Sequence, residues 1–359
     1  MISPALVKDW KGHLHSKYER FAVFLREHAL QNEKKICNKL VKPIRILQRN
    51  LAMQTSEQKT IRARTTDENI WLETSTNASI PDAPASAFNY RVLDSEDAVG
   101  REMFDELVRY ADSKDGDIVI VLLGGRGGQA MYKLIAKLAK TNEIDQLLGR
   151  LHVFTQDALA PMRMDNGLGF VRDFERLLGD DFFKKIKSFT PMQTETDDLE
   201  GELVSYLEKI DSLGGIDIFF LGHGPEAEAA SHVCYVKPGS GARFNDLGGI
   251  IPISSSILEH HINKFKVGGS EVSPEDEEEC RRATSILTLG PASILGAKKI
   301  VQSIVDAATA LAKKESFARF ISEEFASDPA EREKQLDANP GLWIKLHPNV
   351  SSFVLPDLF

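Results

Sequence analysis

Three loops combine glycines, carboxylates and basic side chains directly after short apolar runs. The first two follow residues 118–123 and 151–154, and the third follows residues 216–221. In an α/β protein, ligands and catalytic side chains lie on loops that leave the carboxyl ends of strands. We therefore expect the three loops to form one site.

The first loop has the composition of a phosphate-binding turn. Its glycines Gly124, Gly125, Gly127 and Gly128 let backbone N–H groups approach an anion at the positive end of a helix dipole, and Arg126 adds a guanidinium suited to phosphate. The loop has neither the Lys-Ser/Thr pair of a Walker motif nor GxGxxG spacing, so nucleotide binding is not implied. A plain strand-to-helix turn with a solvated arginine is the alternative interpretation.

The other two loops offer groups for proton transfer. Asp157 follows a strand, where a general base could be mounted, although an aspartate there is also an ordinary helix N-cap. His232 has Glu226, Glu228 and Lys237 close in sequence, and these charges could orient the imidazole or shift its pKa. A simple surface histidine is the alternative.

Composition indicates a globular protein with a full apolar core. The chain has 359 residues, of which 42% are hydrophobic, and a formal net charge of −9. No apolar run reaches the length of a membrane span, and the N-terminus is too polar for a secretory signal, so we expect a soluble, cytoplasmic protein. Cys37, Cys234 and Cys280 lie far apart without CxxC spacing, which favours reduced thiols and gives no zinc motif.

The N-terminal part is basic, whereas the remainder is acidic. Residues 1–65 hold 14 Lys/Arg against five Asp/Glu, and apolar residues recur mostly at steps of four, which predicts an amphipathic helical arm over residues 1–52. Interspersed glutamates favour a solvated helix face over nucleic-acid binding. We expect the arm to pack on its own chain or on a partner subunit in a homo-oligomer. A Thr/Ser/Pro-rich linker is expected over residues 53–87.

The main domain, residues 88–359, alternates short apolar runs with amphipathic stretches. This order predicts an α/β fold with mostly parallel strands buried on both faces. The apolar runs expected as strands are residues 90–93, 118–123, 151–154, 216–221, 250–253, 284–289 and 299–305, and helices are expected at 95–113, 129–140, 170–178, 199–213 and from Pro291.

The order of these motifs resembles the superfamily of glucosamine-6-phosphate deaminases and 6-phosphogluconolactonases, closer to the deaminase branch. The resemblance covers residues 88–359 and rests on GGIDIFFLGHGP, KPGSG, ILTLGPASILGAKKI and KLHPNVSSFVLPD. It implies a modified Rossmann-like sheet flanked by helices. It also implies an activity that opens a sugar ring, moves a proton between C2 and C1 and, in deaminases, releases ammonia. No metal or organic cofactor is implied, because this route uses only proton transfers.

The resemblance assigns roles to the proton-transfer loops. Asp157 matches the family's aspartate that serves as base at C2, although Ala158 replaces the acidic residue that usually follows. Aligned backwards from the KPG segment, His232 matches the ring-opening histidine, but Ala230 and Lys237 replace its acidic neighbours. Aligned forwards from the glycine turn, Glu226 instead replaces the aspartate and Glu228 stands where the histidine belongs. Both alignments stay open.

The phosphate-binding residues implied by the resemblance are also altered. The loop with Arg126 replaces one rich in Ser and Thr, Lys264 falls near the family's phosphate-binding arginine, and Thr309 aligns with a later phosphate lysine. We expect a rebuilt cationic site in which Lys237 is a further candidate.

Three functions remain open. The first is an aldose-ketose isomerase or deaminase acting on a sugar phosphate, with Asp157 moving the C2 proton, His232 assisting ring opening, and Arg126 and Lys264 holding phosphate. The second is a catalytically retired sugar-phosphate sensor or assembly protein. The third is a lactone hydrolase in which His232 activates water. All three take a small-molecule sugar phosphate as partner, and none involves a membrane.

Overall fold

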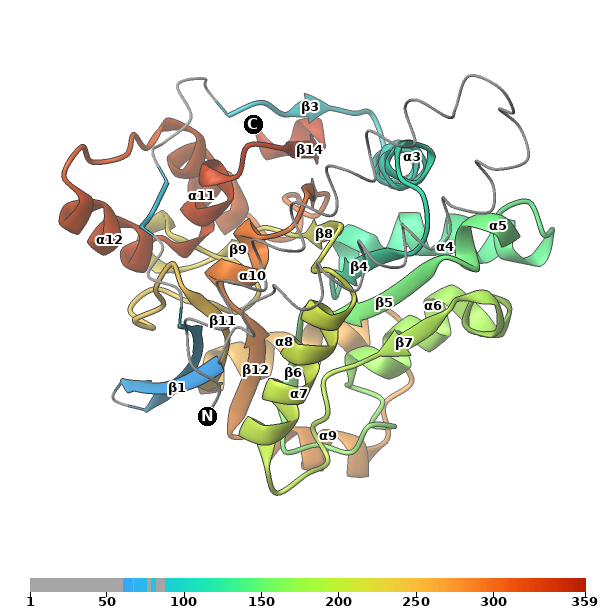
Figure 1. Cartoon of the computed structure of the whole chain (residues 1–359), viewed down its shortest axis with the longest axis horizontal. Coiled ribbons are helices and arrows are strands. Elements are labelled where there is room, and N and C mark those ends of the chain that lie inside the picture. Colours follow the sequence, from blue (N-terminus) through green and yellow to red (C-terminus); the bar gives the residue numbers. More distant parts are fainter. Residues whose placement is uncertain (1–60, 67, 76–78, 82–87) are drawn as a thin grey trace, which may run out of the picture. The chain divides into compact units, whose positions relative to one another are not determined.

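The computed structural model describes residues 61–66, 68–75, 79–81 and 88–359 (Figure 1). The arm expected over residues 1–52 lies outside the described residues.

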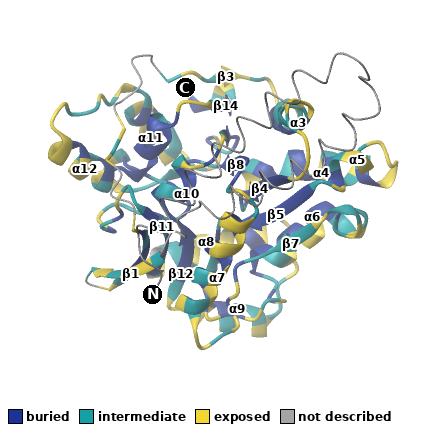
Figure 2. Ribbon diagram, in the orientation of Figure 1, coloured by how far each residue is buried: buried dark blue, intermediate teal, exposed yellow. Residues whose placement is uncertain are grey.

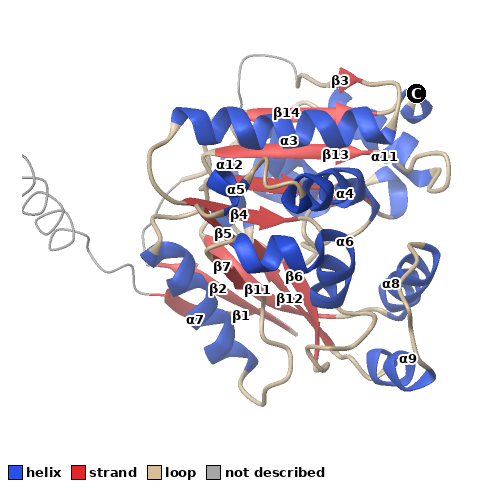
Figure 3. Ribbon diagram, turned by 90° about the vertical axis from the view of Figure 1, so that its right-hand side faces the viewer, coloured by secondary structure: helices blue, strands red, loops and turns tan. Residues whose placement is uncertain are grey.

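A seven-stranded parallel sheet is the main element of the described part (Figure 3). The strand order is β3-β14-β13-β8-β4-β5-β7, and every neighbouring pair is parallel. From β4 the chain runs outward through β5 and β7, then returns to the other side of β4 with β8 and continues to β13 and β14. The strand order therefore reverses between β4 and β8. The strands are β3 (Arg91–Val92), β4 (Ile118–Leu122), β5 (Leu151–Thr155), β7 (Ser188–Thr190), β8 (Ile218–Leu221), β13 (Lys299–Ile304) and β14 (Val350–Val354).

Both faces of this sheet are buried, as Figure 2 shows for β4 and β5. Alternate residues of each strand enter different cores: Val119 and Val121 belong to one cluster, and Ile118 and Ile120 to the other. This two-sided burial explains why the strands appear in the sequence as continuous apolar runs.

Helices cover the two faces in separate groups. The cluster that contains Ile118 takes its helical side chains from α3 (Glu96–Ser113), α4 (Arg126–Lys140), α5 (Asp145–Leu148), α6 (Phe170–Lys185), α8 (Ser255–Val267) and α9 (Pro274–Arg281). The cluster that contains Val119 takes its helical side chains from α7 (Leu199–Ser212), α10 (Pro291–Leu295), α11 (Ala312–Ser322), α12 (Pro329–Ala338) and η2 (Pro340–Leu346). A last short helix, η3 (Pro356–Leu358), follows β14.

A second, antiparallel sheet packs against the Val119 side of the first. Its order is β1-β2-β11-β12-β6, and all of its pairs are antiparallel. Buried residues of β2, β11 and β12 belong to the same cluster as Val119. The strands are β1 (Ile61–Thr66), β2 (Asn69–Thr74), β6 (Asp157–Ala160), β11 (Asp246–Pro252) and β12 (Ser285–Leu289).

The linker predicted over residues 53–87 is wrong for residues 61–74, because these residues form the hairpin of β1 and β2. The folded region includes residues 61–74, so a start near Phe88 is too late. Threonines in this stretch are β-branched strand formers rather than linker residues. The Trp71 side chain is fully buried, and its indole N–H donates to the carbonyl of Ser240 at 3.0 Å. The hairpin is therefore part of the second sheet.

Most of the expected elements are present. The strands at residues 118–123, 151–154 and 216–221 correspond to β4, β5 and β8 within a residue or two, and the run at 299–305 forms β13. The runs at 250–253 and 284–289 are strands, but they pair antiparallel in the second sheet rather than joining the parallel one. The sequence analysis did not predict β14.

Candidate active site

The three loops expected to form one site leave neighbouring strands at the same sheet edge. Gly124 follows β4, Asp157 follows β5, and the turn at Gly224 follows β8. The strand order β13-β8-β4-β5 places all of these carboxyl ends side by side, at the point where the strand order reverses. Open α/β sheets bind ligands in the crevice at such a reversal.

The glycine-rich loop brings the start of a helix against a lysine. Gly125 is the N-cap of α4 with φ of 87°, a conformation that favours glycine, and no side chain caps the helix. A Cβ atom built on Gly125 would lie 2.3 Å from Nζ of Lys264 on α8. Only glycine therefore lets this amine approach the loop so closely.

The amine of Lys264 makes no hydrogen bond or ion pair in the part of the chain that the structure describes. Burial, and then the charge of Lys313, lower its pKa, against the more distant charges of Asp157, Asp306 and Asp173. A cation at the positive end of a helix dipole is unfavourable unless an anion lies between them. The arrangement at Gly125 and Lys264 therefore suits an anionic ligand group.

Lys313 adds a second cation that the sequence analysis missed. Its Nζ lies 2.5 Å from an oxygen of Asp306, which follows β13. Thr309, the residue aligned with the family's phosphate lysine, is exposed. Lys313 lies four residues later, in the first turn of α11, and it reaches the site through packing between distant elements.

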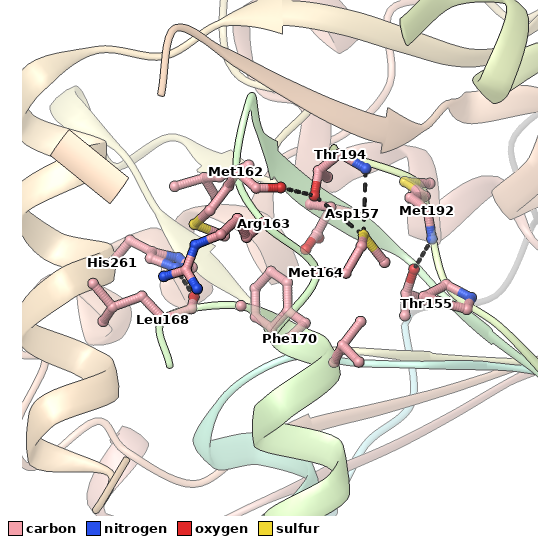
Figure 4. A pocket seen from close by; sticks show the side chains of 15 residues that line it. Thr155, Asp157, Met162, Arg163, Met164, Leu168, Phe170, Met192, Thr194 and His261 are labelled. Carbon is pink, nitrogen blue, oxygen red and sulfur yellow. Dashed lines mark hydrogen bonds between the residues drawn. The ribbon is translucent and has the colours of Figure 1, made fainter. Parts of the chain in front are cut away.

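Asp157 is a buried carboxylate without a hydrogen-bond partner for either oxygen among the described residues (Figure 4). It begins β6 and pairs with Thr288 in the second sheet, so it is not a helix N-cap. Burial raises its pKa to about 7, against the opposing influences of Lys264 and of Gln156. A carboxyl group that titrates near neutral pH is matched to the task of a general base.

A small, mostly apolar pocket opens beside Asp157. Its walls come from β5, β6, the start of α6 and the segment around Met192, as Figure 4 shows. Met164 lies across the pocket and approaches the hydroxyl of Thr194 at 3.4 Å. These walls keep water away from the carboxylate, which accounts for its raised pKa. The pocket is lined by Thr155, Asp157, Ala158, Leu159, Met162, Arg163, Met164, Leu168, Gly169, Phe170, Val171, Pro191, Met192, Thr194 and His261.

His232 is paired with Glu226 across a small hairpin. The hairpin joins β9 (Gly224–Pro225) and β10 (Ser231–His232) through the short helix η1 (Ala227–Ala229). Nδ1 of His232 lies 2.6 Å from Oε1 of Glu226. Because an ionised carboxylate only accepts, Nδ1–H donates and Nε2 remains for chemistry. The exposed Glu228 makes no such pair.

The residues after His232 bring this hairpin next to Asp157. The sulfur of Cys234 lies 3.6 Å from the side-chain oxygen of Gln156, the residue before Asp157. Burial, and then the charge of Asp157, raise the pKa of the Tyr235 hydroxyl, and the Tyr235 ring stacks on His232. The hairpin and the buried carboxylate therefore both lie near the Tyr235 side chain.

Two predicted cations have protein partners. The guanidinium of Arg126 lies 2.6 Å from Glu96 at the start of α3, and the charges of Asp306 and Asp357 also act on it. The amine of Lys237 donates to the carbonyl of Pro252 at 3.3 Å. Among the predicted cations, Lys264 is thus the one that faces the glycine-rich loop without a carboxylate.

Within residues 61–359, apart from the undescribed gaps, no group of three or more His, Cys, Asp or Glu side chains is arranged to hold a metal ion. None of the helices described here is long and apolar enough to cross a membrane.

Comparison with curated proteins identifies relatives of one kind. A glucosamine-6-phosphate deaminase of Malacoplasma penetrans is 24% identical over 244 residues, which cover 64% of this chain and 89% of the relative. The deaminase of Halothermothrix orenii is 26% identical over 211 residues, covering 57% and 78% of the two chains. That of Dictyostelium discoideum is 24% identical over 214 residues, covering 56% and 70%. No family model matches the chain.

Solved structures share the fold. A monomeric glucosamine-6-phosphate deaminase superimposes with a TM-score of 0.60 at 18% identity, covering 76% of this chain and 98% of that one. The 6-phosphogluconolactonase of Trypanosoma brucei gives a TM-score of 0.53 at 15% identity, with the same two coverages. The chain is thus similar in sequence to glucosamine-6-phosphate deaminases, at 24% to 26% identity, and it shares its fold with solved structures of a glucosamine-6-phosphate deaminase and a 6-phosphogluconolactonase.

Proposed function

We propose that the chain acts on an amino-sugar or hexose 6-phosphate as an aldose-ketose isomerase or deaminase. Asp157 is the base that moves the proton between C2 and C1, and His232 assists ring opening. Lys264, Lys313 and the start of α4 hold the phosphate, and Arg126 lies at the rim of this anion site.

The observation that carries the proposal is the state of Asp157. Its carboxylate is buried, lacks a hydrogen-bond partner among the described residues and has a pKa raised to about 7. A structural aspartate at a sheet junction is normally hydrogen-bonded, because an unpaired buried carboxylate is costly. A catalytic base instead must leave its oxygens free for the proton that it removes.

The pair of Glu226 and His232 supports the ring-opening step. Relatives in the resemblance orient their histidine with acidic residues at positions that hold Ala230 and Lys237 here. The 2.6 Å contact with Glu226 supplies a carboxylate from the other side of the hairpin. This pairing gives the imidazole an acidic partner, which supports its proposed role in ring opening.

The proposed reaction needs no external oxidant or reductant. Nε2 of His232 takes the proton of the anomeric hydroxyl and returns it to the ring oxygen as the C1–O5 bond breaks. Asp157 removes the C2 proton, and the electron pair forms a C1–C2 double bond while the C1 carbonyl oxygen takes a proton from solvent. Asp157 then delivers its proton to C1 while the hydroxyl or amine on C2 returns a proton to solvent. The product is a ketose or, with an amine on C2, an imine that adds water and releases ammonia.

A titration followed by a turnover assay tests the proposal. The whole chain is titrated with glucosamine 6-phosphate by calorimetry and then assayed for ammonia and ketose phosphate. We expect binding and turnover, with turnover reduced about 10² to 10⁴-fold in Asp157→Asn and binding retained. Turnover that survives this substitution would overturn the assignment of the base.

Two other functions give different results in the same experiment. Binding without turnover selects the sugar-phosphate sensor, which the altered loop residues Ala230 and Lys237 favour. The pairing of Glu226 with His232 also suits activation of water, so hydrolysis of 6-phosphogluconolactone that is insensitive to Asp157→Asn selects the lactonase.

A further inference from the structure

Cys234 and Tyr235 form a tight turn in an uncommon conformation. Their φ angles are 52° and 64°, in the left-handed region that glycine and asparagine normally occupy. Val233 and Val236 flank the turn and exchange two backbone hydrogen bonds, of 3.3 and 2.8 Å. Two consecutive left-handed residues define a type I′ turn, which usually contains Asn-Gly or Gly-Gly. Side chains as large as cysteine and tyrosine in this turn indicate that the side chains themselves are needed.

Neighbouring elements hold the turn in place. The hydroxyl of Thr288 on β12 donates to the carbonyl of Cys234 at 2.7 Å. The Tyr235 hydroxyl lies 3.4 Å from Nδ1 of His261 on α8. Nε2 of His261 lies 2.7 Å from the carbonyl oxygen of Leu168, so Nε2 donates and Nδ1 is the acceptor for tyrosine. Tyr235 is thus fixed at its backbone and at its hydroxyl.

The fixed ring of Tyr235 lies against the imidazole of His232. The two ring centroids are 5.6 Å apart and the planes differ by 15°, an offset stack. The imidazole also covers the backbone of Gly224, where a built Cβ atom would lie 1.9 Å from Nε2. With Nδ1 bound to Glu226, stacking opposes the ring flip that would put Cδ2 in the place of Nδ1 and move Nε2 to the position of Cε1.

We propose that Tyr235 is a positioning residue for His232: its ring, held by the strained turn and by His261, keeps Nε2 of His232 directed to the substrate. This inference rests on the proposed function for its kinetic part only. The orientation of the imidazole is a property of the protein that can be measured without turnover. The aromatic ring carries the effect, and the hydroxyl serves as its anchor to α8.

The first experiment measures the imidazole directly. Long-range ¹H–¹⁵N NMR on the whole chain labelled in histidine reports the tautomer of His232, with the signal assigned by its loss in His232→Gln. We expect a single Nδ1–H tautomer in the parent chain and in Tyr235→Phe, which retains the ring. In Tyr235→Leu we expect a mixture of both tautomers or exchange broadening. Tyr235→Met, whose unbranched side chain adapts more easily to the site, serves if the leucine variant does not fold.

The second experiment measures kinetics with glucosamine 6-phosphate. Misplacing a catalytic group by about an ångström costs up to about 10²-fold in rate, so we expect kcat of Tyr235→Leu to fall about 10 to 100-fold with KM little changed. The pH profile of kcat should shift on the limb that reports His232. Tyr235→Phe should restore kcat to within about threefold of the parent.

The outcomes separate this inference from the proposed function. A single tautomer in Tyr235→Leu and Tyr235→Met overturns the positioning role, whatever the turnover. Equal losses of kcat in Tyr235→Phe and Tyr235→Leu also overturn it, because they would assign the effect to the hydroxyl alone. Mixed tautomers in a chain that has no turnover uphold the positioning role and reject the enzyme.

Discussion

The burial that raises the pKa of Asp157 also lowers the free energy of unfolding at neutral and higher pH. Burial favours the neutral carboxyl, so the folded protein binds a proton more tightly than the unfolded chain does. The protonated group therefore contributes stability at low pH, and this contribution is lost as the pH rises from its ordinary value of 3.8 through about 7.

Asp157→Asn is accordingly expected to stabilise the protein more at pH 8 than at pH 5. Each pH unit between 5 and the raised pKa of about 7 contributes about 1.4 kcal/mol, so the difference should be about 3 kcal/mol. Guanidinium unfolding at the two pH values measures it. The matched control is Asp217→Asn, because Asp217 is satisfied by Tyr110 and Lys114 at 2.6 Å each. This control should lose stability at pH 8, and an equal gain for Asp157→Asn at both pH values would contradict the account.

The two glutamates of the hairpin provide a second test at the residue scale. Glu226 contacts the imidazole of His232, whereas Glu228 is exposed and follows two residues later in the loop of the hairpin. Removing the carboxylate that orients a catalytic histidine should lower kcat of Glu226→Gln about 10²-fold or more. Glu228→Gln should retain kcat within about twofold. Steady-state kinetics on both variants measures the two kcat values. Equal losses of kcat would show that Glu226 does not orient the histidine.

Sequence reasoning found some site residues and missed others for identifiable reasons. Asp157 and His232 follow apolar runs that end at a sheet edge, a signal that is local in sequence. The choice between Glu226 and Glu228 depends on how the hairpin closes, which no alignment specifies. Lys313 and Tyr235 join the site through packing between distant elements, so their positions could not be predicted from spacing.

At the scale of elements, the glycine-rich loop leaves space that the end of the Lys264 side chain fills. Gly125 has a φ of 87° and leaves room for the end of Lys264. Gly116 has a φ of 84° with no atom near a built Cβ, so it shares the backbone constraint without the contact. Substituting Gly116 and Gly125 in turn therefore separates the effect of a positive φ from the effect of displacing Lys264.

Gly125→Ala should therefore weaken binding of glucosamine 6-phosphate at least tenfold, because the new methyl group displaces Lys264. Gly116→Ala also places a side chain at a positive φ, at a cost of about 1 to 2 kcal/mol in stability, and should leave affinity unchanged because no atom lies near its built Cβ. Calorimetric titration of both variants measures the difference. Equal affinities would show that Lys264 does not hold the anion.

The elements themselves were predictable to different degrees. Strands β4, β5 and β8 are buried on both faces, and their continuous apolar runs identify them. Strand β1 has three exposed residues and polar side chains, so its sequence does not differ from that of a linker. Strand β14 contains two serines, and it is a strand because β13 pairs with it along its length. Local propensity does not specify such strands.

At the scale of the described region, two sheets pack together and hold the site at their junction. Asp157 leaves the parallel sheet and begins the antiparallel one, so its position depends on both. The β1–β2 hairpin contributes to this junction through Trp71, which binds the carbonyl of Ser240 in the segment that follows the site hairpin.

Trp71→Ala should destabilise the protein by about 3 to 5 kcal/mol, since it empties a fully buried site. Arg62→Ala on the same hairpin is the control: its side chain is 61% exposed and pairs with Glu73, so it should cost no more than about 1 kcal/mol. Urea unfolding of the two variants measures both values. A small cost for Trp71→Ala would show that the hairpin is dispensable to the fold.

The central claim is that Asp157 removes the C2 proton of a sugar phosphate bound at the reversal of strand order. The most direct measurement is proton NMR of glucosamine 6-phosphate incubated with the chain in D₂O. The account predicts that the parent chain exchanges the C2 proton for deuterium and that Asp157→Asn, at the same occupancy of ligand, does not. Exchange at equal rates in both chains, or no exchange by the parent chain when the ligand is bound, would contradict it.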